Sequence, residues 1–432
     1  MSKKNFRLSE IINLIGGGTP KRSMKEYWNG DIPWLVVSDF NNDSRYVESS
    51  NEKITQLGLE NSSTKLLKPG MLIISARGTV GKLAQLNSEM AFSQSCYGID
   101  AKTEFTNNDY LYYLLKMKIN ELQSLAHGSI FDTIIRSTFD NIFVDIPSHK
   151  EQEQVLSILS NLDEKIKNNE EQNKTLEQIA KTLFKSWFVD FDPVRAKVEK
   201  KPTGLSKEIN DLFPDSFEDS ELGKIPKNYK VGKLEELAKY LNRGVSPTYV
   251  ENNGVYLVNQ KCIRNGEIDF NLCKQSKEKL SMNERYLEKY DILLNSMGVG
   301  TLGRVAMFYE FDKKITADAL VTIIKGESVG SSFFIYYFLE RMEDYLNTIS
   351  VGSTGQTSLK KEDILNLQMT IPPKNLLDEF GNQLSIFAEK KYLNNEENLI
   401  LRDLRDALLP KLISGELKVS DAENLIEEVK IK

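Results

Sequence analysis

The sequence predicts a mixed α/β (α+β) protein in which two similar globular domains alternate with two long helices. Two observations lead to this fold class. The first is an internal duplication, because short strings recur in the same order at a nearly constant offset. The second is a pair of segments in which apolar residues recur at heptad spacing. Together they predict a pseudo-twofold repeat whose two long helices pair as an antiparallel coiled coil.

The duplication is carried by four pairs of strings. GTVGKLA at 78–84 corresponds to GTLGRVA at 300–306, an offset of 222 residues, and IPWLVVS at 32–38 corresponds to GVYLVNQ at 254–260 at the same offset. GGGTP at 16–20 faces RGVSP at 243–247. Ile146-Pro147 matches Ile371-Pro372 at an offset of 225. A shared order is rarely accidental, so we infer two copies, about 5–190 and 228–415.

Within each copy, the globular part is predicted to mix strands and helices. Apolar runs at 66–78 and 289–298 follow polar turn residues and are typical of buried strands. Stretches 109–126 and 331–349 begin at an Asp or Ser that can cap a helix.

The segment 149–188 and its counterpart after residue 374 are predicted to be the long helices. Their seams alternate in steps of four and three, and each includes two asparagines, which cost stability but can fix register. A packing of each helix only on its own domain remains the alternative. The residues expected to pair are Leu159, Leu162, Ile166, Asn169, Asn173, Leu176 and Leu183 on the first helix and Leu384, Phe387, Asn394, Asn398, Leu401 and Leu408 on the second.

These patterns give the expected domain boundaries. The first globular domain covers 1–148 and the first long helix 149–190. Residues 191–228 contain four prolines and clustered charges, a composition that predicts an irregular linker. The second globular domain covers 229–373, the second long helix 374–415 and a tail 416–432.

Composition excludes several classes of protein. The chain has 432 residues, a formal net charge of −6, two histidines and three cysteines. Sparse, unclustered cysteines indicate reduced thiols rather than disulfides or a zinc site, so we expect no metal in this chain. We find neither a signal-peptide pattern nor an apolar stretch of transmembrane length, which predicts a cytoplasmic protein without membrane contact. On charge balance alone, a nucleic-acid binder would not be expected.

Catalytic motifs are not supported either. GVGTLG at 298–303 formally satisfies G-x-G-x-x-G, but RVAMFYEF after it favours a strand, whereas a dinucleotide site needs a helix there. The shared G-T-x-G-[KR] string is better explained as a tight turn that needs glycine. GGGTPK at 16–21 lacks phosphate-loop spacing, and the carboxylate–lysine set at 214–224 has the wrong spacing for a nuclease. We therefore predict no catalytic residues.

Recognition is the remaining class of function. Basic residues occur on predicted turns at comparable places in both copies, with Tyr27, Trp28, Trp34, Tyr249 and Tyr256 close by. The full set of candidate recognition residues is Lys21, Arg22, Lys25, Arg77, Lys82, Arg243, Arg304, Lys360 and Lys361.

Longer strings resemble the specificity subunit of type I restriction–modification systems. FKSWFVDFDPVRAK at 184–197, continuing to LFPDSFEDSELGKIPKNY at 212–229, is similar to that family's segment between the central helix and the second recognition domain. LLPKLISGEL at 408–417 resembles the family's C-terminal end, and GGGTP with a downstream IPW also fits. The second copy departs from the pattern at RGVSP and at DEFGNQ. The resemblance covers nearly the whole chain.

The resemblance implies a non-catalytic subunit that binds double-stranded DNA. It makes the candidate recognition residues candidate DNA-binding residues, and we expect Lys82 and Arg304, which follow the shared turn, to lie on DNA-facing edges. Each of two target recognition domains would recognise one half of a bipartite, asymmetric sequence, and the paired helices would set the spacing and dock the modification (methyltransferase) subunits, of which two are expected. Restriction subunits would join them. S-adenosylmethionine, ATP and Mg would be held by these partners and none by this chain.

Two other classes of function remain open from the sequence. One is a stand-alone DNA methyltransferase or nuclease, and the other is a coiled-coil scaffold that joins partners without recognising DNA.

Overall fold

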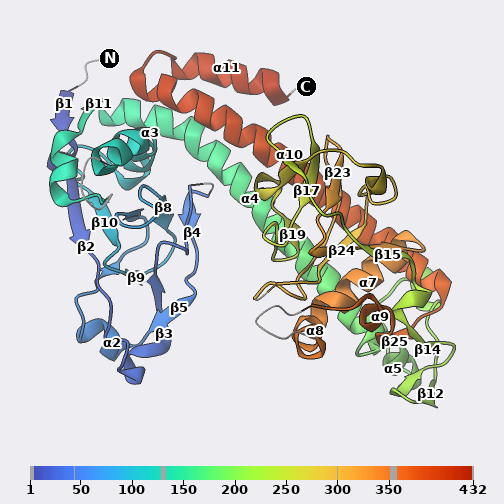
Figure 1. The fold of residues 1–432 in the computed structure, drawn as a ribbon. Coiled ribbons are helices and arrows are strands. Elements are labelled where there is room, and N and C mark those ends of the chain that lie inside the picture. The colour runs from blue at the N-terminus through green and yellow to red at the C-terminus, as the bar shows by residue number, and fades with distance from the viewer. Residues whose placement is uncertain (1–3, 43, 128–132, 299, 351–357, 431–432) are drawn as a thin grey trace. The chain divides into compact units, whose positions relative to one another are not determined.

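A computed structural model of the chain describes residues 4–42, 44–127, 133–298, 300–350 and 358–430. The chain divides into two compact units, one formed by 1–168 with 397–432 and the other by 169–396. Each unit therefore contains one globular domain and a stretch of each long helix (Figure 1).

The first unit is built on a five-stranded sheet of order β2-β10-β7-β8-β4 and a four-stranded sheet of order β5-β3-β9-β6. Helix α3 packs through its apolar face onto the five-stranded sheet, and β1 pairs with β11 beside it. The elements are β1 (Lys4–Arg7), α1 (Leu8–Ile11), β2 (Ile12–Gly16), β3 (Trp28–Leu35), β4 (Tyr46–Val47), β5 (Glu52–Ile54), α2 (Gln56–Glu60), β6 (Leu66–Leu67), β7 (Leu72–Ser75), β8 (Leu83–Leu86), β9 (Met90–Phe92), β10 (Cys96–Ala101), α3 (Asn108–His127) and β11 (Phe143–Ile146).

The second unit has a similar but not identical topology, because its main sheet has four strands rather than five. Its main sheet has the order β15-β24-β21-β22, a second sheet has the order β16-β20-β17-β23, and β14 pairs with β25 as β1 does with β11. In both units the second sheet contains one parallel pair, β3 with β9 and β17 with β23. The elements are β14 (Lys230–Lys233), β15 (Ala238–Arg243), β16 (Tyr249–Val250), β17 (Val255–Val258), β18 (Ile263–Arg264), β19 (Glu267–Ile268), β20 (Lys274–Ser276), β21 (Ile292–Asn295), β22 (Val305–Met307), β23 (Ile315–Ala317), β24 (Val321–Gly326), α7 (Val329–Arg341), α8 (Glu343–Ile349), α9 (Lys361–Leu365) and β25 (Gln368–Ile371).

The shared G-T-x-G string forms the predicted turn in both units. Gly78 and Gly81 have φ of 78° and 86°, and Gly300 and Gly303 have φ of 74° and 85°, values that favour glycine. Strand β22 follows the second turn directly, as the sequence indicated. The turn therefore connects two strands and does not open a nucleotide-binding helix.

The long helices are α4 (His149–Phe188) and α10 (Lys374–Ser414). In the first unit Val155, Leu159 and Leu162 of α4 share a core with Leu408 and Leu412 of α10. In the second unit Phe184 and Trp187 of α4 share a core with Phe380 and Leu384. The early residues of α4 thus pack with the late residues of α10, and the late residues of α4 pack with the early residues of α10. The pairing is therefore antiparallel, as predicted.

The prediction of an irregular linker over 191–228 is wrong. This segment forms α5 (Asp192–Val198), α6 (Lys207–Asn210) and the hairpin of β12 (Phe217–Ser220) with β13 (Gly223–Pro226). Phe191, Val194 and Phe213 are buried in the core of the second unit. Pro193 is tolerated because it lies in the first turn of α5, where its missing N–H is not needed.

Two smaller expectations also change. The single helix expected over 331–349 is split into α7 and α8 at Met342, which leaves the helical conformation with φ −96° and ψ 6°. The expected tail 416–432 contains α11 (Val419–Lys430). Its Ala422 is fully buried in the core of the first unit, so the helix is packed against that unit.

Candidate nucleic-acid interface

A groove of about 340 Å³ opens on the first unit, where the chain leaves β3 and where it enters β10. It contains one of the predicted DNA-binding residues, Arg22. Hydroxyl groups and two valines line most of the rest, so the groove offers both hydrogen-bonding groups and apolar surface. The lining residues are Thr19, Arg22, Trp34, Val36, Val37, Ser38, Ser93 and Ser95.

Arg22 is held rigidly at the edge of this groove. Its guanidinium forms a two-point ion pair with Glu52, and it lies 3.9 Å from the ring centroid of Trp28 and 5.2 Å from that of Trp34. The hydrogen bond with Glu52 raises the pKa of Arg22 and lowers the pKa of Glu52. The side chain remains 56% exposed. A positioned, exposed guanidinium of this kind suits a contact to a phosphate or a base edge.

The turn at 78–81 brings two more predicted residues to the groove. Lys82 donates through Nζ to the backbone carbonyl of Val37 at 2.9 Å, and the backbone N–H of Arg77 donates to the carbonyl of Ser95 at 3.2 Å. Val37 and Ser95 both line the groove. Lys82 is therefore half-buried and braces the groove wall, whereas the Arg77 side chain is exposed.

Lys21 and Lys25 are exposed on the chain that flanks Arg22. Five predicted residues of the first unit thus gather on the elements that build this groove.

The predicted residues of the second unit fall into two groups. Arg304 lines a cavity of about 770 Å³ with Lys181, Arg264 and Glu340. Its guanidinium donates to the carbonyl of Gly300 at 2.8 Å, within its own turn. Lys82 and Arg304 therefore occupy matching positions but make different contacts, because the first reaches across to a neighbouring loop and the second folds back.

The second group consists of Arg243, Lys360 and Lys361. Arg243 donates to the carbonyl of Leu359 at 2.9 Å, and Lys361 donates to Oδ1 of Asn242, the neighbour of Arg243, at 2.9 Å. These bonds bring the end of β15 and the start of α9 together. The three cations form one exposed basic cluster, which the sequence could not have shown because residues 243 and 360 are far apart in the chain.

The predicted seam residues lie where the long helices meet. Asn173 and Asn394 are buried and bonded to each other at 2.9 Å, and Asn173 also donates to Asn395 at 2.8 Å. Lys391 of the seam pairs with Glu177 at 2.6 Å. Leu159, Leu162, Ile166, Asn169, Leu384, Asn398 and Leu408 are buried, and Leu176, Leu183, Phe387 and Leu401 are half-buried.

Comparison with known proteins decides the family. The family model of the type I restriction modification DNA specificity domain matches this chain twice, over 2–178 and 226–398. The chain belongs to this family. It is 29% identical to the type I restriction enzyme MjaIX specificity subunit of Methanocaldococcus jannaschii, over 96% of this chain and 93% of the relative. It is 26% identical to the HindI specificity subunit of Haemophilus influenzae, over 87% of this chain and 92% of the relative.

The fold agrees with this assignment. The crystal structure of the type I restriction–modification S subunit from M. genitalium matches with a TM-score of 0.52 and 12% identity, over 95% of this chain and 96% of that one. The two matched ranges overlap most of the two copies inferred from the internal duplication, about 5–190 and 228–415.

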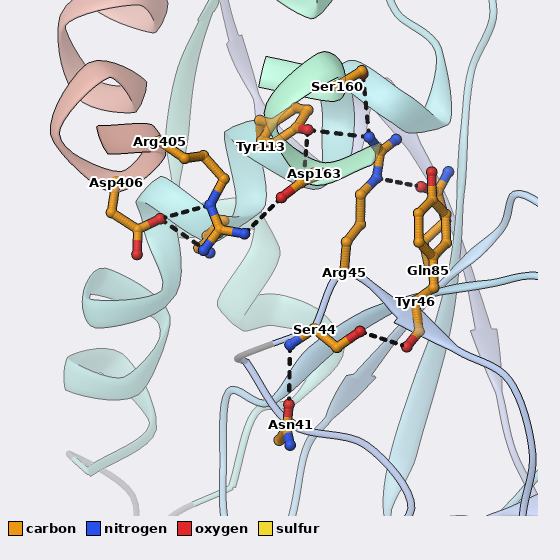
Figure 2. A network of polar contacts seen from close by, with 11 residues as sticks. Asn41, Ser44, Arg45, Tyr46, Gln85, Tyr113, Ser160, Asp163, Arg405 and Asp406 are labelled. Carbon is orange, nitrogen blue, oxygen red and sulfur yellow. Dashed lines mark hydrogen bonds and ion pairs between the residues drawn. The ribbon is translucent and has the colours of Figure 1, made fainter. Parts of the chain in front are cut away.

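The specificity domain of the first unit also contains a buried charged cluster that sequence reasoning missed (Figure 2). Arg45, at the start of β4, and Arg405, on α10, are 4% and 2% exposed, and Asp163 of α4 lies between them. Arg and Asp are almost never fully buried unless they are paired, and these three residues lie far apart in the chain, so the sequence did not show that they pair. The sequence does show that the two copies differ here, since Asp163 and Arg405 match Ala388 and Ala180 at the offset of 225.

Among the residues that the structure describes, there is no group of three or more His, Cys, Asp or Glu side chains placed to hold a metal ion. Within the same residues, none of the helices is both long and apolar enough to cross a bilayer.

Proposed function

We propose that this chain is the DNA-sequence-recognition subunit of a type I restriction–modification complex, in which each specificity domain recognises one half of a bipartite target. The observation that carries this proposal is the double match to the DNA specificity domain, which falls on two units of similar topology. The rigidly held Arg22 and the basic cluster at Arg243 supply the side chains that such recognition needs. Phosphate contacts would position each domain, and contacts to base edges would give the sequence.

The decisive experiment maps methylated adenines across the genome of a host with and without this gene, in the presence of the modification subunits. We expect a bipartite, asymmetric motif that disappears when the gene is deleted. Methylation that persists without the gene would contradict the proposal. Methylation by the purified chain alone would favour the stand-alone enzyme. If deletion of the gene prevented assembly of the complex but left the methylated DNA motif unchanged, the result would favour the scaffold.

A second experiment tests the two turn cations. Replacing Lys82 and Arg304 with alanine should weaken DNA binding by the assembled methyltransferase. If both contact phosphates, the negative slope of log affinity against log salt should become shallower by about 1.8, since each lost contact removes about 0.9. Lys224→Ala, an exposed lysine on β13, is the matched control and should leave the slope unchanged. An unchanged slope in the double variant would remove both residues from the interface.

We further propose that the modification subunits, two in number, dock on the paired helices and that restriction subunits join the complex. S-adenosylmethionine, ATP and Mg would be bound by those partners, and the complex would act in the cytoplasm, where its DNA lies. Exposed apolar residues support docking on α10, because Ile386, Leu393 and Ile400 recur every seven residues and are 68%, 53% and 55% exposed.

Docking can be tested with Ile386→Asp and Leu393→Asp together. We expect the double variant to lose co-purification with the modification subunit while keeping its circular dichroism spectrum. Leu280→Asp is the control, because Leu280 is 90% exposed and belongs to neither α4 nor α10. Full co-purification of the helix variant would place the partner elsewhere.

A further inference from the structure

One segment of the first unit joins the candidate DNA groove to the long helices. Val36, Val37 and Ser38 line the groove at the start of this segment. Asn42 donates to the carbonyl of Gly81 and accepts from the N–H of Leu83, which ties the segment to the turn that carries Arg77 and Lys82. Three residues beyond Asn42 lies Arg45, which is 4% exposed and whose side chain points toward Ser160 and Gln85 (Figure 2).

Arg45 makes a full set of polar contacts there. It forms an ion pair with Asp109 and donates to Oε1 of Gln85 at 2.8 Å and to the hydroxyl of Tyr113 at 3.1 Å. It also donates to Oγ of Ser160 on α4 at 3.2 Å. The guanidinium therefore binds β8, α3 and α4 at once, and its planar fork of donors is suited to this.

The cluster continues from α3 through α4 to α10. Tyr113 donates to one oxygen of Asp163, and the other oxygen accepts from Arg405 at 2.6 Å. Arg405 also donates to Asp406 at 2.9 Å, and Asp406 pairs with Lys116 of α3 at 3.2 Å. The side chains of Asp163 and Arg405 are each 3% exposed. A cluster centred on the buried Arg45, Asp163 and Arg405, with the half-exposed carboxylates of Asp109 and Asp406 at its rim, thus connects the groove segment with both long helices.

Stability alone does not explain this cluster. Replacing a buried ionic cluster by apolar residues is often neutral or stabilising. The second unit uses the apolar solution at the same repeat positions, where Ala180 and Ala388 are buried among aromatic side chains. Arg45 itself matches Glu267, which is exposed. Helix pairing therefore does not require the cluster. What the cluster adds is a single defined arrangement of the segments that it connects.

We propose that Arg45 is a positioning residue for DNA recognition by the first specificity domain. It fixes the segment that forms one wall of the groove to the helix pair, so that the groove keeps one shape and one orientation on α4. Arg45 is buried and does not touch DNA. This inference rests on the proposed function, and it assigns to the first domain a device that the second domain lacks at the matching positions.

The test uses the full chain assembled with its modification subunits and measures methylation at sites with one mismatched base in either half of the target. Arg22→Ala identifies which half the first domain recognises. We expect Arg45→Met to lower discrimination in that half by about tenfold, the worth of one good base contact, and to leave the other half unchanged. Arg45→Lys should give an intermediate loss, because a single ammonium cannot reproduce the fork.

Two variants keep the test informative if Arg45→Met folds poorly. Ser160→Ala removes only the bond from Arg45 to α4 and should lower discrimination in the same half by a smaller factor. Lys118→Met is the matched control, because it removes an exposed ion pair with Glu121 on the same helix α3. It should change neither half.

The outcomes separate the two proposals. A general loss of folded protein would reduce methylation without changing discrimination between halves. Unchanged discrimination in Arg45→Met and Ser160→Ala, or an equal loss in both halves, would overturn the positioning role. If the unaltered chain directs no bipartite methylation, the proposed function fails instead.

Discussion

The buried pair of Asp163 and Arg405 should behave as one unit in the free energy of unfolding. Asp163→Ala leaves Arg405 with Asp406 alone and Tyr113 without its acceptor, and Arg405→Ala leaves a carboxylate that is 3% exposed without its cation. Breaking a buried pair in this way costs about 3 kcal/mol for each single change. The double variant should also lose about 3 kcal/mol rather than about 6, because neither charge is left alone. The expected coupling is therefore about 3 kcal/mol.

Hydrogen exchange of α3 and of residues 149–168 in the full chain measures this effect locally, because opening of the first unit exposes those amides. The control cycle uses Lys165→Ala and Glu397→Ala. These residues form an ion pair at 3.2 Å on the same two helices, but their side chains are 48% and 44% exposed. Exposed pairs contribute at most about 1 kcal/mol. If the losses of free energy in the Asp163–Arg405 cycle were additive, as those of the control cycle are expected to be, the view that the cluster acts as a unit would be refuted.

Three further predictions concern single residues. Gly381→Ala should destabilise the chain, although alanine favours a helix by about 1 kcal/mol over glycine, because a Cβ there would lie 2.6 Å from the backbone of Gly330. Urea unfolding measures the change in stability, with Ser385→Ala on the same helix as the control. A stabilised Gly381→Ala variant would contradict this packing. Burial raises the pKa of Asp291 to about 6, against the pull of Lys325. Since the folded state then holds a proton that the unfolded state has released, stability should fall by about 3 kcal/mol in total as the pH rises from about 3 to about 7. Asp291→Asn should remove that component from the pH profile of the urea midpoint, and an unchanged profile would exclude Asp291 as its source. Burial raises the pKa of the Cys96 thiol to about 12, so iodoacetamide should label this thiol at pH 8 only after unfolding. Peptide mass locates the labelled cysteine. Rapid labelling of Cys96 in the native chain would show that the thiol is accessible and would contradict the prediction.

Several features of the fold followed from local pattern. The repeated strings predicted two similar units because homologous segments keep the same glycines where the backbone needs positive φ, as at Gly78 and Gly300. The heptad stripe predicted paired helices because its period places one face of each helix on the other. The segment 191–228 was misjudged because prolines and charges were weighed above Phe191 and Phe213, which find a core only in the folded chain.

The candidate site was predicted less completely. Arg22, Arg77 and Lys82 could be named from their positions on turns, but their convergence on one groove depends on how the fold brings the sheet of β3 beside the sheet of β7 and β10. The contacts of Arg304 could not be inferred from Lys82, because the same turn allows a side chain to reach out or to fold back. These remain predicted DNA contacts until binding is measured.

The sequence by itself determined the duplication, the long helices and the family, because these depend on residue order, spacing and similarity. Only the tertiary structure showed the groove beside Arg22 and the charged cluster of Arg45, Asp163 and Arg405. The physical reason is that burial and ion pairing are properties of side chains brought together from distant positions. A lone Arg at 45, an Asp at 163 and an Arg at 405 each resemble ordinary solvated charges until the fold removes water from all three.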